Sequence, residues 1–431
     1  MAKYIKDVVN PNRYLFYTFG LLIVVGTLLL YNPYIHFNGH KQFIDTLFMA
    51  TSAVCVTGLT TVNVSDFGLV GQLIILILIQ LGGLGIMYLS STLFLLLRGQ
   101  LSFKQRIMFA KYHGTYEFFN MEKVLPVILV YTFVSEFMGG FFLFFGFLFE
   151  GLSVKQSIYF SIFHSISAFC NAGLSPIDSS LIGLNNIIKV TVMSLIILGG
   201  LGFYVVYDLY IYITKRSVLR LHTKVVFITT LFLIFLGACF LLIFEKGNLN
   251  YIDALFQSIT SRTAGFSTVN TGSLEVESKF LTIFLMIAGA SPASTGGGIK
   301  TTTAFISFYA IYVILRGKTD FNIFKRRIPI ESVLRAFSIT LLYLLVCFIG
   351  TILILSIQHF SLLEAAFEVV SAMGTVGLSL GITPHLEAPA KFIIILIMFI
   401  GRIGPSSLLL MMIKRERKYK IMYPEEKILL G

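Results

Sequence analysis

The sequence predicts an all-α integral membrane protein with four pseudo-symmetric helix–pore-loop–helix repeats around one central pore. Composition gives the first indication. Hydrophobic residues make up 56% of the 431 residues, charged residues 13%, and the mean hydropathy is +0.86, whereas a soluble domain carries about 25% charged residues. Apolar runs long enough to span about 30 Å of hydrocarbon recur along the chain. The second indication is that four short segments resemble one another.

Each of these segments places a glycine at the same point, followed by Leu or Phe and then by Thr or Ser. They are 51–61 (TSAVCVTGLTT), 166–176 (ISAFCNAGLSP), 258–268 (SITSRTAGFST) and 370–380 (VSAMGTVGLSL), and they align Gly58, Gly173, Gly265 and Gly377. Each ends an apolar stretch that is too short to cross the bilayer. We therefore expect four re-entrant helices, each followed by a loop.

The four loops predict an ion-selectivity filter. Non-helical backbone at membrane depth must be buried in protein or line water, and glycine permits the left-handed conformations that such a loop needs. Rings of backbone carbonyls replace the water shell of K⁺ in selective pores, and 375–379 (TVGLS) begins like the TVGYG of K⁺ channels. The predicted K⁺-binding residues are Val56, Thr57, Gly58, Asn171, Ala172, Gly173, Thr263, Ala264, Gly265, Thr375, Val376 and Gly377.

The elements repeat in the same order four times. The first helices are predicted at 13–34, 123–149, 223–244 and 332–358. The re-entrant helices follow at 44–54, 156–169, 252–261 and 363–373, and the second helices at 69–97, 187–213, 280–315 and 390–414. These give repeats 1–110, 111–220, 221–328 (with a broken second helix) and 329–431 (with a C-terminal tail), which is roughly 100 residues each and longer than solenoid repeats.

Glycine clusters mark the second helices. Segments 81–85 and 198–202 both read LGGLG, and 400–404 reads IGRIG at the corresponding position. No strand precedes them, so nucleotide binding is disfavoured, and we interpret them as sites of close helix packing.

The third repeat differs, because its second helix contains 288–303 (AGASPASTGGGIKTTT). Proline and consecutive glycines cannot continue a regular helix. A phosphate-binding loop is rejected, because Ile299 stands where that motif needs glycine. A simple kink is one interpretation. We favour a polar loop in a water-lined cavity inside the filter, with gate residues Gly289, Ser291, Pro292, Ser294, Thr295, Gly296, Gly297, Gly298 and Lys300.

Arg402 lies in the otherwise apolar run 392–410 and is included in the predicted gate. An arginine at mid-membrane costs about 2.5–3.5 kcal/mol on insertion scales, so it should face the bundle interior. Snorkelling to the cytoplasmic surface is the alternative.

The basic residues fix the orientation. With the N-terminus inside and the glycine segments re-entering from outside, most of the 33 Lys and Arg fall on inner segments, as the positive-inside rule requires. The inner segments are 3–13, 98–123, 215–224, 316–335 and 414–427. Both termini are therefore expected in the cytoplasm of a plasma-membrane protein surrounded by lipid, and the charge gives no reason to expect nucleic-acid binding.

These motifs resemble the Trk/Ktr/HKT superfamily of K⁺ transport proteins across essentially the whole chain. The matching segments are 171–175 (NAGLS), 261–268 (SRTAGFST), 296–303 (GGGIKTTT), 374–378 (GTVGL) and 399–405 (FIGRIGP). The length and the tail 422–431 (MYPEEKILLG) resemble the Ktr-type membrane subunit.

The resemblance implies a bacterial K⁺ uptake protein with a channel-like pathway. It implies a homodimer with one pore per protomer, a cytosolic ring of RCK-type nucleotide-binding regulatory subunits, and an intramembrane gate at 289–303 with Arg402 facing the pore near it. Some relatives that favour Na⁺ carry serine at the first filter glycine, so Gly58 implies K⁺ preference. K⁺ is the permeant ion, and no bound organic cofactor is expected.

Two other functions are weighed. Na⁺- or H⁺-coupled symport would need an intramembrane carboxylate, and Glu136, Asp208 and Glu368 are candidates, although each can be a buried helix partner. An intramembrane enzyme is not expected. His36 and His40 have metal-ligand spacing, but Gly39 disfavours a helix and no HExxH motif accompanies them.

Overall fold

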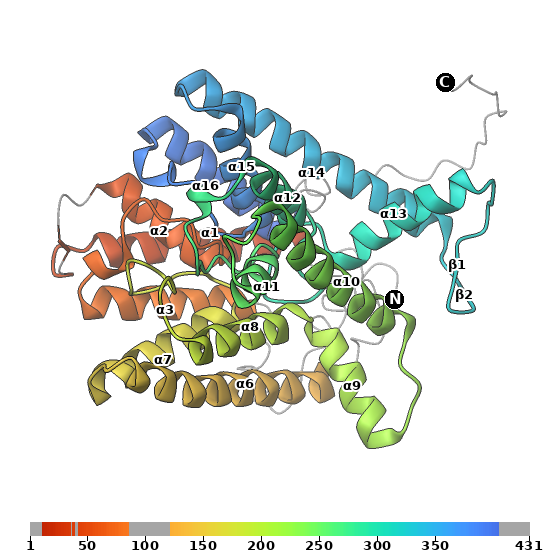
Figure 1. Cartoon of the computed structure of the whole chain (residues 1–431), viewed down its shortest axis with the longest axis horizontal. Coiled ribbons are helices and arrows are strands. Elements are labelled where there is room, and N and C mark those ends of the chain that lie inside the picture. The colour runs from red at the N-terminus through yellow and green to blue at the C-terminus, as the bar shows by residue number, and fades with distance from the viewer. Residues whose placement is uncertain (1–10, 36, 39–41, 86–120, 405–431) are drawn as a thin grey trace, which may run out of the picture.

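The computed structural model describes residues 11–35, 37–38, 42–85 and 121–404. Within these ranges the chain is almost entirely helical, as predicted. Four helices are long and apolar enough to cross a membrane, or five if one sharply bent pair is counted as a single span. In Figure 1 the repeats follow one another from red (α1–α3) through yellow (α6–α8) and green (α10–α12) to blue (α14–α16).

The first helices are the long membrane spans and the re-entrant helices are short. The first helices are α1 (Pro11–Tyr31), α6 (Met121–Phe149), α10 (Leu221–Phe244) and α14 (Ile330–Ile357). The re-entrant helices are α2 (Phe43–Cys55), α7 (Val154–Phe169), α11 (Tyr251–Thr260) and α15 (Leu362–Gly374). Capping boxes begin two of them, because Ser153 pairs with Gln156 and Ser361 pairs with Glu364.

The prediction of continuous second helices was wrong for repeat two. Its second helix is two helices, α8 (Asn186–Gly200) and α9 (Phe203–Lys215), bent by 89°. The last glycine of the LGGLG motif causes the break, because Gly202 has φ 88° and this left-handed conformation interrupts the hydrogen-bond ladder of a right-handed helix.

The same backbone conformation ends the described second helices of repeats one and four. α3 (Leu69–Leu84) stops at Gly85 with φ 80°, and α16 (Ala388–Ile403) stops at Gly404 with φ 88°. In repeat three, α12 (Val276–Ile287) and α13 (Thr301–Leu315) are separated by the predicted loop. The predicted parts 86–97 and 405–414, and the basic segments 98–120 and 414–427, lie outside the described residues.

The earlier glycines of these motifs pack closely, as predicted. A Cβ on Gly82, Gly199 or Gly401 would lie within 2.2 Å of a backbone oxygen at the end of the re-entrant helix of the same repeat. These oxygens belong to Val54, Phe169 and Met373.

The repeats close into a circle, because each second helix contacts the re-entrant helix of the next repeat. The pairs are α3 with α7, α8 with α11, α12 with α15, and α16 with α2. Polar side chains meet at three of the four joints. Tyr159 bonds Gln72, Lys189 pairs with Asp253 at 2.7 Å, and Lys391 pairs with Asp45 at 2.7 Å.

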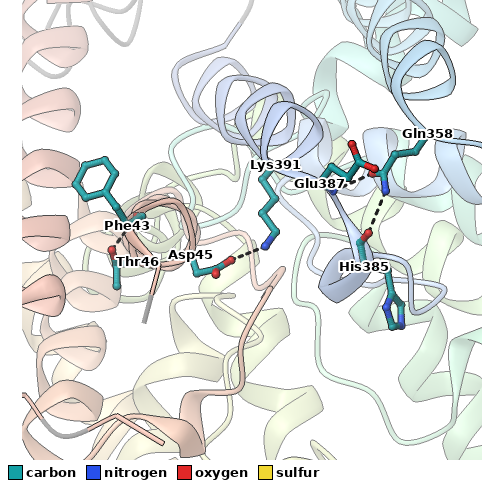
Figure 2. Close-up of polar contacts among 7 residues, drawn as sticks. All are labelled: Phe43, Asp45, Thr46, Gln358, His385, Glu387 and Lys391. Carbon is teal, nitrogen blue, oxygen red and sulfur yellow. Dashed lines mark hydrogen bonds and ion pairs between the residues drawn. The ribbon is translucent and has the colours of Figure 1, made fainter. Parts of the chain in front are cut away.

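The pair Lys391–Asp45 joins the last repeat to the first, and Figure 2 shows the lysine of α16 reaching the aspartate of α2. Both side chains are about nine-tenths buried. Beside it, Gln358 donates to His385 O and accepts from Glu387 N, which ties α14 to the start of α16.

Two more features lie at one end of the molecule (right in Figure 1): α9 and a hairpin of β1 (Asn322–Ile323) and β2 (Arg326–Arg327). The hairpin turn contains Phe324 and Lys325, both with positive φ, which matches the strand twist of a tight hairpin.

Asp45→Asn should destabilise the protein, because it leaves Lys391 buried without its counter-charge. Breaking a buried ion pair costs about 3–5 kcal/mol, so the apparent melting temperature in detergent, followed by size-exclusion chromatography after heating, should fall clearly. Asp320→Asn is the matched control, because the Asp320–Arg327 pair is mostly exposed and contributes about 1 kcal/mol at most. Equal melting temperatures for the two variants would contradict the role given to Asp45.

Candidate functional site

A residue with left-handed backbone follows each re-entrant helix within three positions and stands two positions before the aligned glycine. These residues are Val56 (φ 57°), Asn171 (φ 59°), Thr263 (φ 75°) and Thr375 (φ 49°). The glycines are also left-handed, with φ 94° at Gly58, 66° at Gly173, 79° at Gly265 and 92° at Gly377. Left-handed Val or Thr is strained, so the same conformation in four loops indicates that the surrounding structure imposes it.

Hydrogen bonds back to the helix hold this geometry. The amide of Thr57 donates to Ser52 O at 2.8 Å, and Ala172 and Val376 donate equivalently to Ser167 and Ser371, also at 2.8 Å. In repeat three, Ala264 N donates to Thr260 O at 2.9 Å. These bonds satisfy the last carbonyls of each helix, so the chain leaves every helix in the same direction.

The structure brings the four glycines together in cyclic order. A Cβ on Gly58 would lie 2.6 Å from Ala172 O, and one on Gly173 would lie 2.5 Å from Ala264 O. The circle continues from Gly265 to Val376 O at 2.4 Å and from Gly377 to Thr57 O at 2.3 Å. A side chain does not fit at these positions, so the close approach of the four loops requires glycine.

A second layer of hydroxyls, which sequence reasoning missed, lies behind the ring. Ser52 accepts from Gly58 N at 3.0 Å and Ser371 accepts from Gly377 N at 3.1 Å. Ser167 donates to Leu174 O and Thr260 donates to Phe266 O, each at 2.7 Å. The signal was present in the sequence, because three of the four segments have serine six residues before the glycine.

The ring opens on one side into a cavity of about 140 Å³. Gly58, Gly173 and Gly265 line its floor, and Asp178 is the charged residue in its wall. Within the ring, the hydroxyls of Thr57, Thr263 and Thr375 are buried and have no hydrogen-bond partner among the described residues. Buried polar atoms are nearly always paired, so these three hydroxyls are free to contact an ion or water.

The loop between α12 and α13 lies directly against the other side of the ring. A Cβ on Gly296 would lie 2.1 Å from Thr263 Oγ1, and one on Gly297 would lie 2.3 Å from Thr375 Oγ1. Gly298 approaches Gly374 O, and Lys300 Nζ donates to Gly296 O at 2.7 Å. The predicted filter residues and these predicted gate residues are therefore adjacent.

The rest of the loop packs on the α8–α9 break. Ser291 N donates to Gly200 O at 3.1 Å, and Phe203 N donates to Ala293 O at 2.8 Å. Pro292 O lies against Gly202, and the Thr295 hydroxyl donates to Phe169 O at 3.2 Å. At the ends of the loop, Gly289 N bonds Ile299 O, and the Thr301 hydroxyl bonds that of Ser291. Ser294 Oγ is buried with no partner among the described residues.

The loop is well packed despite its many glycines and hydroxyls. Ser291 and Thr295 are at most 1% exposed, and backbone hydrogen bonds hold the segment at both ends. Glycine allows close backbone contact here.

Arg402 points into the bundle rather than to a surface. Its guanidinium donates to Thr295 O of the loop and to Gly82 O and Gly83 O at the end of α3. One side chain of repeat four therefore links the loop of repeat three to repeat one.

The carboxylates considered for symport are each held by neighbouring groups. Glu136 accepts from Gln80 Nε2 at 3.0 Å. Asp208 accepts from the Thr223 hydroxyl at 2.6 Å and pairs with Arg220. Glu368 accepts from two hydroxyls, those of Ser379 and Thr383.

Cys55 and Cys170 are fully buried, and Cys170 Sγ packs against Gly83. His36 and His40 lie outside the described residues.

Comparison with known proteins agrees with this architecture. The profile of the TrkH family, described as cation transport protein, matches residues 7–421. The chain is 37% identical to the potassium/sodium uptake protein NtpJ of Enterococcus hirae, over 100% of this chain and 99% of that one. It is 33% identical to the Ktr system potassium uptake protein B of Vibrio alginolyticus, over 97% and 94% of the two chains.

A solved structure supports the fold. The potassium transporter TrkH of Vibrio parahaemolyticus superposes with a TM-score of 0.71 at 18% identity, over 94% of this chain and 86% of that one. Together with the apolar helices, these similarities show a multi-pass cell-membrane protein and not an enzyme. The chain belongs to the TrkH family of cation transport proteins.

Proposed function

We propose that this protein is the membrane subunit of a K⁺ uptake system, with a channel-like pathway through the glycine ring. The cyclic contact of four glycine loops carries the proposal, because such a ring can present backbone carbonyls to a dehydrated cation. Two relatives are named as potassium uptake proteins and one as a potassium/sodium uptake protein. A monovalent cation gains about 2.3 kcal/mol per 100 mV of membrane potential, which suffices for uphill uptake.

The electrostatics of the ring favour a cation. All four re-entrant helices direct their C-terminal ends toward the ring, and a helix C-terminus carries about half a negative charge. The three unpartnered threonine hydroxyls add neutral oxygen ligands. We therefore assign K⁺ binding to the backbone of 56–58, 171–173, 263–265 and 375–377.

Gly58→Ser should lower the preference for K⁺ over Na⁺ severalfold. The new Cβ would clash with Ala172 O, and φ 94° disfavours any side chain, so the carbonyl geometry must change. The measurement is the K⁺/Na⁺ ratio of initial uptake rates into proteoliposomes under imposed voltage. Gly20→Ser is the control, because nothing lies within 4 Å of that position. An unchanged ratio in Gly58→Ser would remove Gly58 from the filter.

We further propose that the loop 289–300 is an intramembrane gate held closed by Arg402. Gly296 and Gly297 contact ring residues, so the loop obstructs the inner side of the ring. The guanidinium bonds the carbonyl of Thr295 and places a positive charge beside the pathway, which repels an entering K⁺. Because the loop is well packed, opening requires a change at its contacts with α8, α9 and Arg402.

Arg402→Ala should raise K⁺ flux at fixed voltage, because it removes both the bonds to the loop and the repelling charge. Flux of ⁸⁶Rb⁺ into proteoliposomes, normalised to protein of verified size, is the measurement. Arg402→Lys should give an intermediate flux, because it keeps the charge but loses the planar fork of donors. Wild-type flux in Arg402→Ala would show that the loop is not a gate.

A homodimer and a cytosolic ring of RCK-type regulatory subunits complete the proposal. The described structure supports a binding site for this partner in the basic connection between α13 and α14. There Lys325, Arg326 and Arg327 form an exposed hairpin with more charge than orientation requires. We infer that acidic groups of the regulatory ring bind this hairpin.

Arg326→Glu combined with Arg327→Glu should weaken co-purification with the regulatory subunit while leaving dimer formation intact. The control is Lys246→Glu, on a loop of the predicted outer side. The measurement is the co-eluting fraction in size-exclusion chromatography at low and high salt, because surface charge contacts weaken with salt. Undiminished co-elution of the charge-reversed variant at low salt would place the partner elsewhere.

A further inference from the structure

We propose that His164 and Glu368 are positioning residues that hold two opposite filter loops from behind and thereby set the preference for K⁺. This inference rests on the proposed function of the ring. Both residues stand nine positions before the aligned glycine of their repeat, and both are completely buried. Repeats two and four, which contain them, lie across the ring from each other.

Glu368 of α15 bonds the segment that follows the filter glycine of its loop, and it does so through both carboxylate oxygens. Ser379, two residues after Gly377, donates to Oε2 at 2.9 Å. Thr383, at the start of the next helical turn, donates to Oε1 and also lies 2.9 Å from the Ser379 hydroxyl. The carboxylate therefore joins the re-entrant helix to the chain on the far side of the filter glycine.

His164 of α7 makes the corresponding bond in repeat two. Its Nδ1 donates to Phe160 O at 2.8 Å, and its Nε2 lies 3.0 Å from the hydroxyl of Ser175. Ser175, like Ser379, stands two residues after its filter glycine. The imidazole also packs against Phe266, which directly follows Gly265 in the neighbouring repeat.

Repeats one and three cannot make this bond, because Met49 and Phe256 occupy the same position. In repeat three the equivalent residue, Ser267, is held from the neighbouring repeat instead. Its carbonyl accepts from Leu181 N at 3.0 Å, and its amide donates to Ser180 Oγ at 3.2 Å. The ring is thus supported with two-fold rather than four-fold symmetry.

The physical consequence concerns the spacing of the carbonyls. The residues before each glycine are fixed by hydrogen bonds to the end of the re-entrant helix. The residues after the glycine need a hydrogen-bond partner of their own. Hydrogen bonds of buried groups act in a low dielectric, where they are strong and directional. Removing one side-chain anchor lets the loop relax, so a ring that fits K⁺ would accept the smaller Na⁺ more readily.

Ser175→Ala and Ser379→Ala test this inference with little change of volume. We expect each to lower the K⁺/Na⁺ ratio of initial uptake rates about threefold to tenfold, the range for losing one or two hydrogen bonds. Glu368→Gln should stay near the wild-type ratio, because its amide can bond both hydroxyls, whereas Glu368→Ala should fall below it. Ser161→Ala is the matched control, because that buried hydroxyl of α7 bonds, among the described residues, only Ile158 O of its own helix.

The outcomes separate the inference from the proposed function. A wild-type protein that shows no preference for K⁺ overturns the proposed function, and the inference with it. A wild-type protein that prefers K⁺, with Ser175→Ala and Ser379→Ala matching Ser161→Ala in their ratios, overturns the inference alone. Size-exclusion profiles equal to wild type establish that each variant measured is folded.

Discussion

Four helices that stop inside the membrane impose the constraint on which the structure depends. Each leaves non-helical backbone at a depth where lipid offers no hydrogen-bond partner. The chain meets this constraint by placing the four loops against one another and surrounding them with the second helices. Glycine is required at two kinds of contact: where the loops meet, as at Gly58, and where the second helices touch the re-entrant helices, as at Gly82.

The same constraint explains the breaks in the second helices. Beyond the ring, the α8–α9 break exposes backbone that the loop of repeat three satisfies, and the loop is in turn satisfied by α8, α9 and Arg402. The loop is therefore part of a continuous hydrogen-bonded layer beneath the ring. The proposed gate would have to exchange one set of bonds for another on opening, which would make it sensitive to the position of α9 and of Arg402.

Much of this could be predicted from the sequence. The four repeats, the re-entrant helices and the glycine alignment follow from local pattern, because glycine and short apolar runs are informative in a membrane. The break at Gly202 was missed because LGGLG also fits close helix packing, and only the backbone angle separates the two. The bonds of Ser52 and Glu368 join residues of the same repeat, but a hydroxyl or carboxylate on a re-entrant helix does not by itself indicate which group it will meet. Arg402 was correctly assigned to the interior. Its bonding partners were not predicted, because those on α3 are hundreds of residues away in sequence and the one in the loop is a whole repeat back.

The most direct measurement is the location of a bound K⁺ analogue in an experimental structure. Crystals of the protein grown with Tl⁺ should show anomalous density on the axis enclosed by Gly58, Gly173, Gly265 and Gly377, at coordinating distance from carbonyl oxygens of all four repeats. Replacing Tl⁺ with Na⁺ should remove that density. Tl⁺ bound only outside the ring, or a ring occupied equally by Na⁺, would contradict the assignment of these four loops as the selectivity filter.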